Sequence, residues 1–323
     1  MCPYPERHRP GRLIRMANPV LMKLSRNDRV RRLTTALPVT RQVVDRFVAG
    51  TTEEEALTSV RDLLARGLDV TVDRLGEDVT DRAQADATAS AYVGFLDHLH
   101  AAGLTPAAEV SLKLSAMGQA LGADGPAISL ENARRVCEAA AAAGTTVSVD
   151  MEDHTTVDAT LDTVRELRAD FPWVATVVQA MLKRTEADLA SLTHAGSRIR
   201  LVKGAYAEPA SAAYQSKAEV DDAYARCLRL LMAGDGYPQI ATHDPALVDA
   251  AERMIVEYAR SSDSYEFQML FGIRTGEQQR LHDAGHRMRV YVPFGDDWYG
   301  YFVRRLAERP ANVGFFVRAL VSR

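Results

Sequence analysis

The sequence lacks the features that mark a membrane-spanning, secreted or cysteine-rich protein. None of its apolar runs approaches the ~18–20 residues that a membrane-spanning helix needs. Its three cysteines (Cys2, Cys137 and Cys227) are scattered, and no C-x-x-C spacing occurs. This pattern argues against a disulfide framework and a cysteine metal site, and it is typical of reduced thiols in the cytosol. We therefore expect a cytoplasmic protein without a transmembrane segment.

The chain also lacks a strong charge of one sign. It has 39 Lys and Arg against 43 Asp and Glu, a net charge of −4, which argues against a nucleic-acid-binding protein. Residues 1–33 are the exception, since they are basic and lack the apolar stretch of a secretory signal. We interpret them as a disordered arm. A start site at Met16 or Met22, or a peripheral contact with an anionic membrane surface, are alternatives that the sequence does not rank.

The length and the alternation of patterns predict one α/β domain over residues 34–323. Helical periodicity with capping residues or terminal glycines marks several stretches. These are residues 53–67, 81–102, 130–143, 184–195, 217–233, 245–260 and 275–284. Between them lie short apolar, β-rich runs. The runs are residues 68–72, 108–115, 146–151, 175–181, 198–204, 239–243, 265–270 and 289–294.

Eight strands that alternate with helices favour a closed (β/α)8 barrel of the TIM type with extra N-terminal helices. An open, doubly wound sheet is the alternative, although no G-x-G-x-x-G motif follows any strand. The strands are largely apolar throughout, which we take as the sign of a sheet covered on both faces.

Polar residues recur where the catalytic face of such a barrel is expected, at the carboxyl ends of the strands. A charge inside an apolar run needs a partner, because burying it unpaired costs several kcal/mol. We expect Lys113 to pair with Asp150 of the neighbouring strand. The other candidates along the strands are Ser115, Glu152, Gln179, Arg200, Lys203, Thr242, His243, Glu266, Gln268 and Tyr291.

His243 could ligate a metal if Asp150 and Glu266 joined it, which leaves a metal-dependent lyase or hydrolase as a rival interpretation. The many cations of the region repel a divalent metal and suit an anionic cofactor, so we predict no metal. Gly204 would permit close approach of a ligand to the backbone, although a tight turn explains it equally well.

The helix predicted over residues 298–309 is the most informative feature. Tyr301, Arg304, Arg305 and Glu308 follow at i, i+3, i+4 and i+7 on one face. A solvated ion pair from Arg304 to Glu308 would account for this pattern. A barrel mouth would instead turn the adjacent arginines into a clamp for a carboxylate, which guanidinium binds in a bidentate manner.

At this point the sequence resembles the proline dehydrogenase family over roughly residues 40–320. The resemblance rests on ordered blocks, namely RFVAGTT (46–52), VSLKLSAMG (110–118), VSVDMED (147–153), RLVKGAY (200–206), ATHD (241–244), YEFQMLFG (265–272), VYVPFG (290–295) and WYGYFVRRLAER (298–309). The mild departures are Gly300, where relatives often have Pro, and Phe294, where they often have Tyr.

The resemblance implies a distorted barrel that binds FAD at the carboxyl ends of its strands and oxidises L-proline to 1-pyrroline-5-carboxylate. It implies that Arg304, Arg305 and Lys113 bind the carboxylate of proline, while Tyr291, Tyr301 and Leu270 line its ring. Asp150 and Glu308 would belong to the polar network, and Tyr206 would lie near the isoalloxazine. The FAD contacts would be Gln179, Arg200, Lys203, Gly204, Ala205, Thr242 and His243.

The partners that the resemblance implies are a membrane quinone as electron acceptor and a separate pyrroline-5-carboxylate dehydrogenase. No ribbon-helix-helix DNA-binding region or fused aldehyde dehydrogenase is apparent in the sequence. Hydroxyproline oxidation on the same scaffold is the nearest rival, and the tyrosine at position 291 favours unsubstituted proline in the family.

Overall fold

The computed structural model describes residue 44 and residues 46–77 and 79–308. The chain divides into two compact units, one of residues 46–298 and one of residues 1–45 and 299–323, and each is considered by itself. The basic segment 1–33 lies outside the described residues. The first unit contains the eight predicted strands in order.

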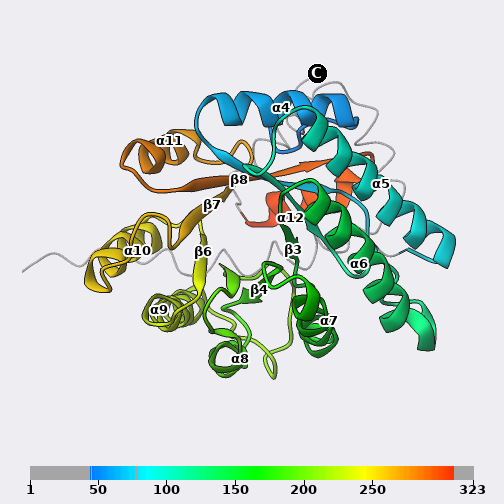
Figure 1. Cartoon of the computed structure of the whole chain (residues 1–323). Coiled ribbons are helices and arrows are strands. Elements are labelled where there is room, and N and C mark those ends of the chain that lie inside the picture. The colour runs from blue at the N-terminus through cyan, green and yellow to red at the C-terminus, as the bar shows by residue number, and fades with distance from the viewer. Residues whose placement is uncertain (1–43, 45, 78, 309–323) are drawn as a thin grey trace, which may run out of the picture. The chain divides into compact units, whose positions relative to one another are not determined.

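The unit alternates strands and helices along its length (Figure 1). The strands are β1 (Asp69–Arg74), β2 (Ala108–Leu112), β3 (Val147–Val149), β4 (Ala175–Gln179), β5 (Arg198–Val202), β6 (Tyr237–Ala241), β7 (Glu266–Leu270) and β8 (Met288–Phe294). The helices are α4 (Glu53–Ala65), α5 (Arg82–Ala101), a short 3-10 turn (Gly122–Asp124), α6 (Gly125–Ala142), α7 (Val157–Asp170), α8 (Thr185–Leu192), α9 (Lys217–Ala233), α10 (Pro245–Glu257) and α11 (Thr275–Asp283). Helix α12 (Trp298–Glu308) follows β8.

The strands form a closed barrel in which each pairs in parallel with the next. Closure is made by β1 and β8, where Asp69 is opposite Arg289 and Thr71 is opposite Tyr291. The helices α4 to α11 lie outside the ring of strands (Figure 1). The predicted (β/α)8 barrel is therefore confirmed, and its carboxyl strand ends lie together at one end.

Local sequence signals fix the helix ends. Thr52 and Ser216 each close a capping box, with Glu55 and Glu219 as the third helical residues. Each box satisfies backbone N–H groups that a helix start otherwise leaves without partners. These are the starts that the sequence predicted for α4 and α9.

Helix α7 is the barrel helix whose bounds were not predicted from the sequence. Its N-cap, Thr156, makes no side-chain capping bond, and the helix ends at Asp170 with Phe171, not a glycine, as the C-cap. Neither a capping side chain nor a terminal glycine marks its limits, so its periodicity was the main sign of this helix. Pro172, directly after Phe171, is the end signal that was available.

The two faces of the barrel sheet differ in polarity, which the sequence interpretation did not anticipate. Val70 and Val72 are fully buried and share a hydrophobic core with the helix residues Phe95 and Leu96. The alternate positions carry buried polar groups that reach across the lumen between strands that are not neighbours. The description of the strands as apolar throughout was therefore wrong, because it holds only for the face that packs on the helices.

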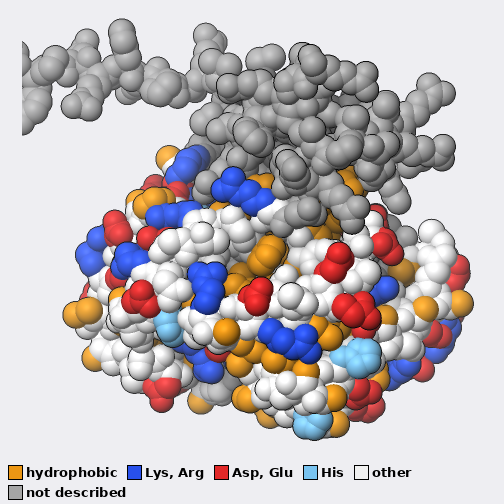
Figure 2. Space-filling view, turned by 90° about the horizontal axis from the view of Figure 1, so that it is seen from above, with side chains coloured by type: hydrophobic (Ala, Val, Ile, Leu, Met, Phe, Trp, Pro, Cys, Tyr) orange, Lys and Arg blue, Asp and Glu red, His pale blue; other side chains and the backbone are white. Residues whose placement is uncertain are grey.

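The surface of the barrel is electrostatically mixed where it can be seen. On the face drawn in Figure 2, acidic and basic side chains are interspersed and no field of one sign forms. This agrees with the net charge of −4. Within the stretches 46–77 and 79–308, no helix combines the length and the apolar character needed to cross a bilayer.

Candidate active site

A cluster of charged and polar side chains fills the carboxyl end of the barrel. We call it the mouth cluster; its members are Asp73, Lys113, Asp150, Arg200 and Tyr291. They come from five strands or the residues directly after them. Contacts between β8 and β3, and between β5 and β3, show that these side chains meet inside the barrel.

Lys113 has Asp73 as its main partner. Its ammonium donates to Asp73 Oδ2 at 2.7 Å, whereas Asp150 Oδ2 lies 3.8 Å away. The predicted pairing of Lys113 with Asp150 is therefore present, but the shorter contact is to Asp73, which was not predicted. Asp73 is the penultimate residue of β1 and was not singled out, because the predicted apolar run of that strand ended at residue 72. The polar end of the first strand was the signal that could have found it.

Asp150 connects the strands of the mouth cluster to each other. It accepts from Ser111 Oγ at 2.7 Å, from Arg200 Nη1 at 2.7 Å and from the Tyr291 hydroxyl at 2.7 Å. The Arg200 guanidinium also lies over the Tyr291 ring, 5.4 Å from its centroid. A carboxylate that accepts several bonds is held in one orientation, so this arrangement is preorganised.

Burial and mutual charge set the protonation of the cluster. Burial raises the pKa of Asp73 above its usual range, and the nearby Lys113 only partly offsets it. Burial also opposes the charge of Lys113, yet the carboxylates of Asp73 and Asp150 hold its pKa well above the usual range. The pKa of Tyr291 is raised by burial and by Asp150. Lys113 therefore stays a cation and Tyr291 a hydroxyl donor at neutral pH.

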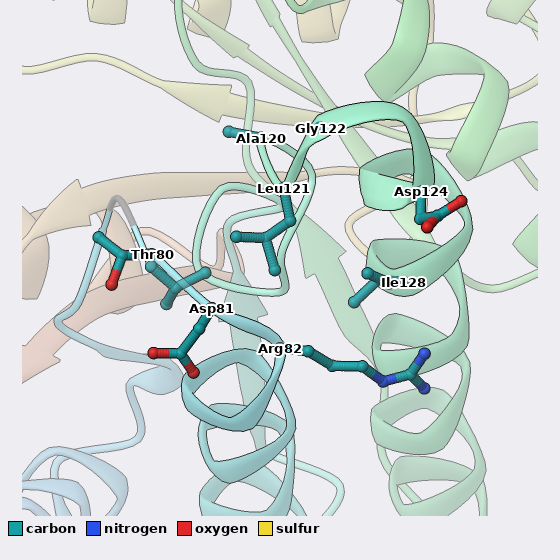
Figure 3. Close-up of a pocket in the computed structure, with 9 residues that line it drawn as sticks. Thr80, Asp81, Arg82, Ala120, Leu121, Gly122, Asp124 and Ile128 are labelled. Atoms are coloured by element: carbon teal, nitrogen blue, oxygen red, sulfur yellow. The ribbon is translucent and has the colours of Figure 1, made fainter.

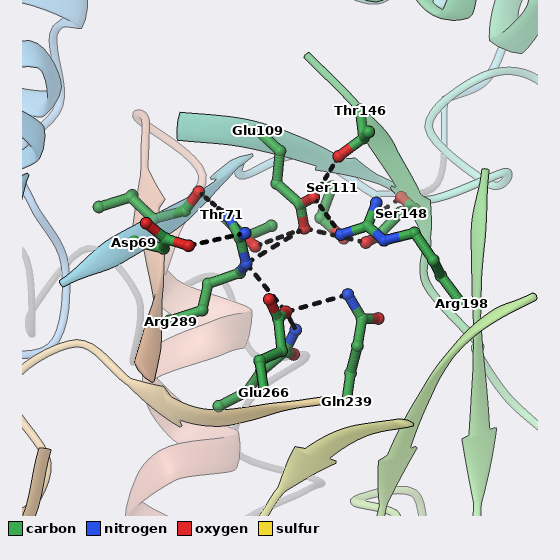
Figure 4. A network of polar contacts seen from close by, with 12 residues as sticks. Asp69, Thr71, Glu109, Ser111, Thr146, Ser148, Arg198, Gln239, Glu266 and Arg289 are labelled. Atoms are coloured by element: carbon green, nitrogen blue, oxygen red, sulfur yellow. Dashed lines mark hydrogen bonds and ion pairs between the residues drawn. The ribbon is translucent and has the colours of Figure 1, made fainter. Parts of the chain in front are cut away.

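A second cluster lies at the amino end of the strands (Figure 4). We call it the base network; its members are Glu109, Arg198, Gln239, Glu266 and Arg289. Arg289 Nε donates to Glu266 at 2.9 Å, and Arg198 Nη2 donates to Glu109 at 2.8 Å. Glu266 and Glu109 are fully buried. Burial opposes their charge, but the arginines, Arg289 at Glu266 and Arg198 at Glu109, lower the pKa of each.

The base network corrects the placement of Glu266. Glu266 is the first residue of β7, so it lies at the opposite end of that strand from the mouth. It therefore does not join His243 and Asp150 as the metal-binding interpretation required. Among residues 46–77 and 79–308, no group of three or more His, Cys, Asp or Glu side chains is arranged to hold a metal ion.

Three residues predicted to contact a cofactor gather around the end of β6. Lys203 donates to Asp244 at 2.8 Å and also pairs with Asp221. His243 accepts from the Leu270 backbone N–H at 2.9 Å through Nε2, which ties the end of β6 to β7. Thr242 Oγ1 accepts from the backbone N–H of Asp244. The His243 bond requires an unprotonated Nε2, which places any ring proton of the neutral form on Nδ1.

The other predicted cofactor contacts lie at the ends of β4 and β5. Gln179 is buried and donates to the Glu152 carbonyl at 2.7 Å. Gly204 has φ +106°, and a Cβ there would meet Met181 at 2.5 Å. Ala205 is exposed and Tyr206 is half-buried in the loop after β5. The backbone at Gly204 requires a glycine, and cationic and amide side chains lie near it. Such a set of hydrogen-bond donors suits a cofactor that carries phosphate groups.

Two residues close to the mouth, Ser115 and Glu152, were noticed in sequence but not connected. The Ser115 hydroxyl donates to Glu152 at 2.6 Å, and the Ser115 backbone N–H donates to the same carboxylate at 3.0 Å. Burial raises the pKa of Glu152. Together these bonds join the loops after β2 and β3, so they support the position of Lys113 between them.

Helix α12 was predicted at residues 298–309 and is found over Trp298–Glu308. From Tyr299 on it belongs to the second compact unit. The Arg305 guanidinium lies over the Tyr301 ring, 5.1 Å from its centroid, as the i, i+4 spacing predicted. The side chains of Arg304 and Glu308 lie outside the described residues, so their predicted roles stay predictions.

A surface groove of about 550 Å³ lies apart from this chemistry. It is lined by residues 79–82, 120–122, 124 and 128, and Figure 3 shows Arg82 extending toward α6. Arg82 pairs there with Glu131 at 2.6 Å. No predicted site residue lines the groove, and we place the candidate site at the mouth cluster because the buried, interlinked charges are there.

Comparison with known proteins gives a consistent result. Residues 56–318 match the family described as Proline dehydrogenase. The chain is 41% identical to Proline dehydrogenase of Deinococcus radiodurans over 87% of this chain and 90% of that one. It is 35% identical to Proline dehydrogenase 2 of Bacillus subtilis over 88% and 92%. A solved structure of proline utilization A (PutA) from Bdellovibrio bacteriovorus matches with a TM-score of 0.78 and 26% identity, covering 83% of this chain and 33% of that longer one.

Proposed function

The chain belongs to the proline dehydrogenase family, and on that premise we propose that it oxidises L-proline to 1-pyrroline-5-carboxylate with FAD as the acceptor. The reaction removes two hydrogens, one as a proton from the ring nitrogen and one as a hydride from Cδ, and leaves a C=N bond. When bound, FAD supplies the two-electron acceptor of this oxidation. Proline dehydrogenases as a family are generally flavin-dependent, which agrees with the phosphate-compatible residues at the ends of β4, β5 and β6.

The observation that carries the proposal is the mouth cluster itself. Lys113 is a buried cation between two carboxylates, and it provides a fixed positive charge where the carboxylate of proline would bind. Tyr291 is held by Asp150, so its ring is available as a wall for the pyrrolidine ring. A preorganised cation and a fixed aromatic wall reduce the freedom of the bound amino acid, which is the main contribution that positioning makes to catalysis.

The family resemblance supplies the remaining roles of the substrate site. Arg304 and Arg305 of α12 would bind the carboxylate with Lys113, while Leu270 and Tyr301 would line the ring and Glu308 would belong to the surrounding network. The positive charges would also favour the neutral ring amine over its protonated form. Loss of that proton frees the lone pair from which the C=N bond forms.

The resemblance likewise supplies the cofactor contacts. Gln179, Arg200, Lys203, Gly204, Ala205, Thr242 and His243 would bind FAD, with Tyr206 near its ring system. Lys203 is held between Asp221 and Asp244, so it presents a localised positive charge at the end of β5. We further propose that the electrons pass to a membrane quinone. A separate pyrroline-5-carboxylate dehydrogenase would then oxidise the product.

The test is spectroscopic. Purified protein is expected to carry the yellow flavin absorbance and to lose it when L-proline is added without air. A colourless protein that takes up no FAD, or a flavin that proline does not bleach, would refute the proposal. The same bleaching measurement with hydroxyproline in place of proline tests the rival function, the oxidation of hydroxyproline on the same scaffold.

A variant separates the substrate role from the cofactor role. Arg304→Ala is expected to lower kcat/KM for proline by roughly 10- to 100-fold, mainly through KM, because a charge-assisted bond is worth ~1.5–3 kcal/mol. Its FAD content should match the wild type. The matched control is Arg280→Ala on α11, an exposed arginine that pairs with Glu252 and Glu277. Equal loss of FAD and of proline binding in Arg304→Ala would place this arginine at the cofactor.

A further inference from the structure

Gln268 connects the two buried clusters of the barrel lumen. Its Nε2 donates to Glu266 of the base network at 2.6 Å, and its Oε1 accepts from Arg200 Nε of the mouth cluster at 2.6 Å. Gln268 is only 4% exposed, and Glu266 and Arg200 are buried as well. Its two amide ends therefore have defined protein partners and little access to solvent.

The orientation of the Gln268 amide is determined by Glu266 and its other partners. Glu266 also accepts from Arg289 Nε at 2.9 Å and from Gln239 Nε2 at 3.0 Å. Arg289 keeps the pKa of Glu266 below its usual range despite burial, so this carboxylate can only accept. The Gln268 amide must then turn its NH2 toward Glu266 and its oxygen toward Arg200. If the amide were flipped, its oxygen would face the Glu266 carboxylate and its NH2 would face Arg200 Nε. Neither contact could then be a hydrogen bond.

The link also fixes the guanidinium of Arg200. With Nε held by Gln268, the planar group places Nη1 against Asp150 at 2.7 Å and Ser111 at 3.2 Å. Asp150 accepts the Tyr291 hydroxyl through its other oxygen. A guanidinium is rigid, so a bond at Nε sets the direction of the opposite edge. The chain of contacts from Glu266 to Tyr291 is thereby continuous.

We propose that Gln268 is a positioning residue for the oxidation of proline, which holds Arg200 against Asp150 and so fixes the Tyr291 wall of the substrate site. The inference deepens the proposed function and rests on it. Glu266 sets the orientation of the Gln268 amide. This fully buried carboxylate therefore helps to position the substrate site although it lies at the other end of the barrel.

The first variant removes the link and keeps the volume. Gln268→Met retains an unbranched side chain of similar length without the amide. We expect kcat/KM for proline, expressed per bound flavin, to fall roughly tenfold, and the holoenzyme to bind the unreactive analogue tetrahydrofuran-2-carboxylate less tightly by a similar factor. The control is Tyr237→Phe, which removes another hydrogen bond to Glu266, at 3.2 Å, from a residue that is not register-paired with Arg200. It should leave both quantities within about twofold of the wild type.

A double-mutant cycle tests whether Gln268 acts through Arg200. In an Arg200→Met background, Gln268→Met is expected to cause little further loss, because the group that it positions is gone. A purely structural role would instead give additive losses in the cycle. Additive losses, or equal losses in Gln268→Met and Tyr237→Phe, would overturn the proposal.

An exchange variant covers the case in which a single variant does not fold. Glu266→Gln with Gln268→Glu keeps the total charge, and it again offers Arg200 Nε an acceptor and Arg289 an acceptor. Recovery of analogue binding in the double variant, relative to Glu266→Gln alone, supports the link, and failure to recover contradicts it. The failure of the proposed function and the failure of the positioning role give different results. If proline does not bleach the flavin of the wild-type protein, the proposed function is refuted. If the wild type is active but the losses in the double-mutant cycle are additive, only the positioning role is refuted.

Discussion

The pair of Asp73 and Lys113 is expected to be the largest single electrostatic contribution at the mouth. The ammonium and the carboxylate are 2.7 Å apart, and their side chains are 9% and 1% exposed. At an effective dielectric constant of ~20, two charges at this distance attract by about 6 kcal/mol, before the cost of desolvating both is subtracted. Removing one partner leaves the other charge buried, which typically costs ~3–5 kcal/mol.

Asp73→Asn should therefore destabilise the protein by about 3 kcal/mol, the lower end of that range, since Asp150 at 3.8 Å still attracts Lys113. In a domain of this size 1 kcal/mol corresponds to ~2–4 °C, so Tm should fall by roughly 6–12 °C. Asn keeps the shape of Asp and one acceptor oxygen, so the loss measures the charge. The value should change little between about pH 6 and pH 8, where Lys113 remains charged.

Lys113→Met should behave differently with pH. Burial already raises the pKa of Asp73, and without Lys113 this pKa rises further. A raised folded-state pKa stabilises fully below the unfolded value and loses that contribution as the pH rises through the folded value. The destabilisation by Lys113→Met should therefore be small near pH 4 and grow toward pH 8.

The assay is thermal unfolding of the wild type, both single variants and the double variant across this pH range. The double variant should be less destabilised than the sum of the single variants by at least about 1.5 kcal/mol at pH 7.5, because the isolated buried charge is absent. A loss below about 1 kcal/mol in Asp73→Asn, or additive losses in the cycle, would show that the pair is solvated and that the reasoning on burial is wrong.

Two further predictions concern the two ends of the barrel. Glu109→Gln should destabilise by ~3–5 kcal/mol, because Arg198 loses its buried partner and Arg289 loses one of its two buried carboxylates. It should also flatten the fall of Tm between about pH 5 and pH 3, since a depressed carboxylate pKa stabilises above the unfolded value of 4.5 and this contribution is lost as the pH falls. An unchanged acid limb in thermal unfolding would contradict this. Gly204→Ala should cost ~1–3 kcal/mol and lower the FAD content, because its φ is +106° and its Cβ would lie 2.5 Å from Met181; adding Met181→Ala should restore only the steric part, and full restoration would show that the backbone angle is not limiting.

The fold could be predicted from sequence because its signals are local. Capping boxes at Thr52 and Ser216 and the glycine after most helices mark the helix limits without any tertiary information. Short apolar runs between them mark the strands, and a count of eight favours closure. Helix α7 shows the limit of this method, since its start lacks a side-chain cap and its end lacks a glycine.

The residues of the mouth cluster could largely be predicted from the sequence, but not which of them pair with each other. Sequence places Lys113, Asp150, Arg200 and Tyr291 at the mouth, and the structure brings all four together. It cannot rank Asp73 above Asp150 as the partner of Lys113, because Asp73 lies near the end of β1 and Asp150 directly after β3, both strands flank β2, and the choice depends on side-chain direction. Glu266 was misplaced although the predicted run 265–270 already put it at the amino end of the strand, where β7 begins with it.

The polarity of the lumen explains both the errors and the chemistry. In many barrels branched apolar side chains fill the interior, and the sequence of such a strand is apolar on both faces. Here the alternate positions of β2 and β5 carry Glu109, Ser111, Arg198 and Arg200, all of which lie in contact across the lumen. Charges packed in this way are costly unless they are paired, and the base network pairs Arg198 with Glu109 and Arg289 with Glu266. Gln268 bridges the two clusters by a hydrogen bond at each end, and Arg200 also approaches Glu109 to 3.9 Å. We infer from this that the interior of the barrel, rather than its loops alone, sets the geometry of the site.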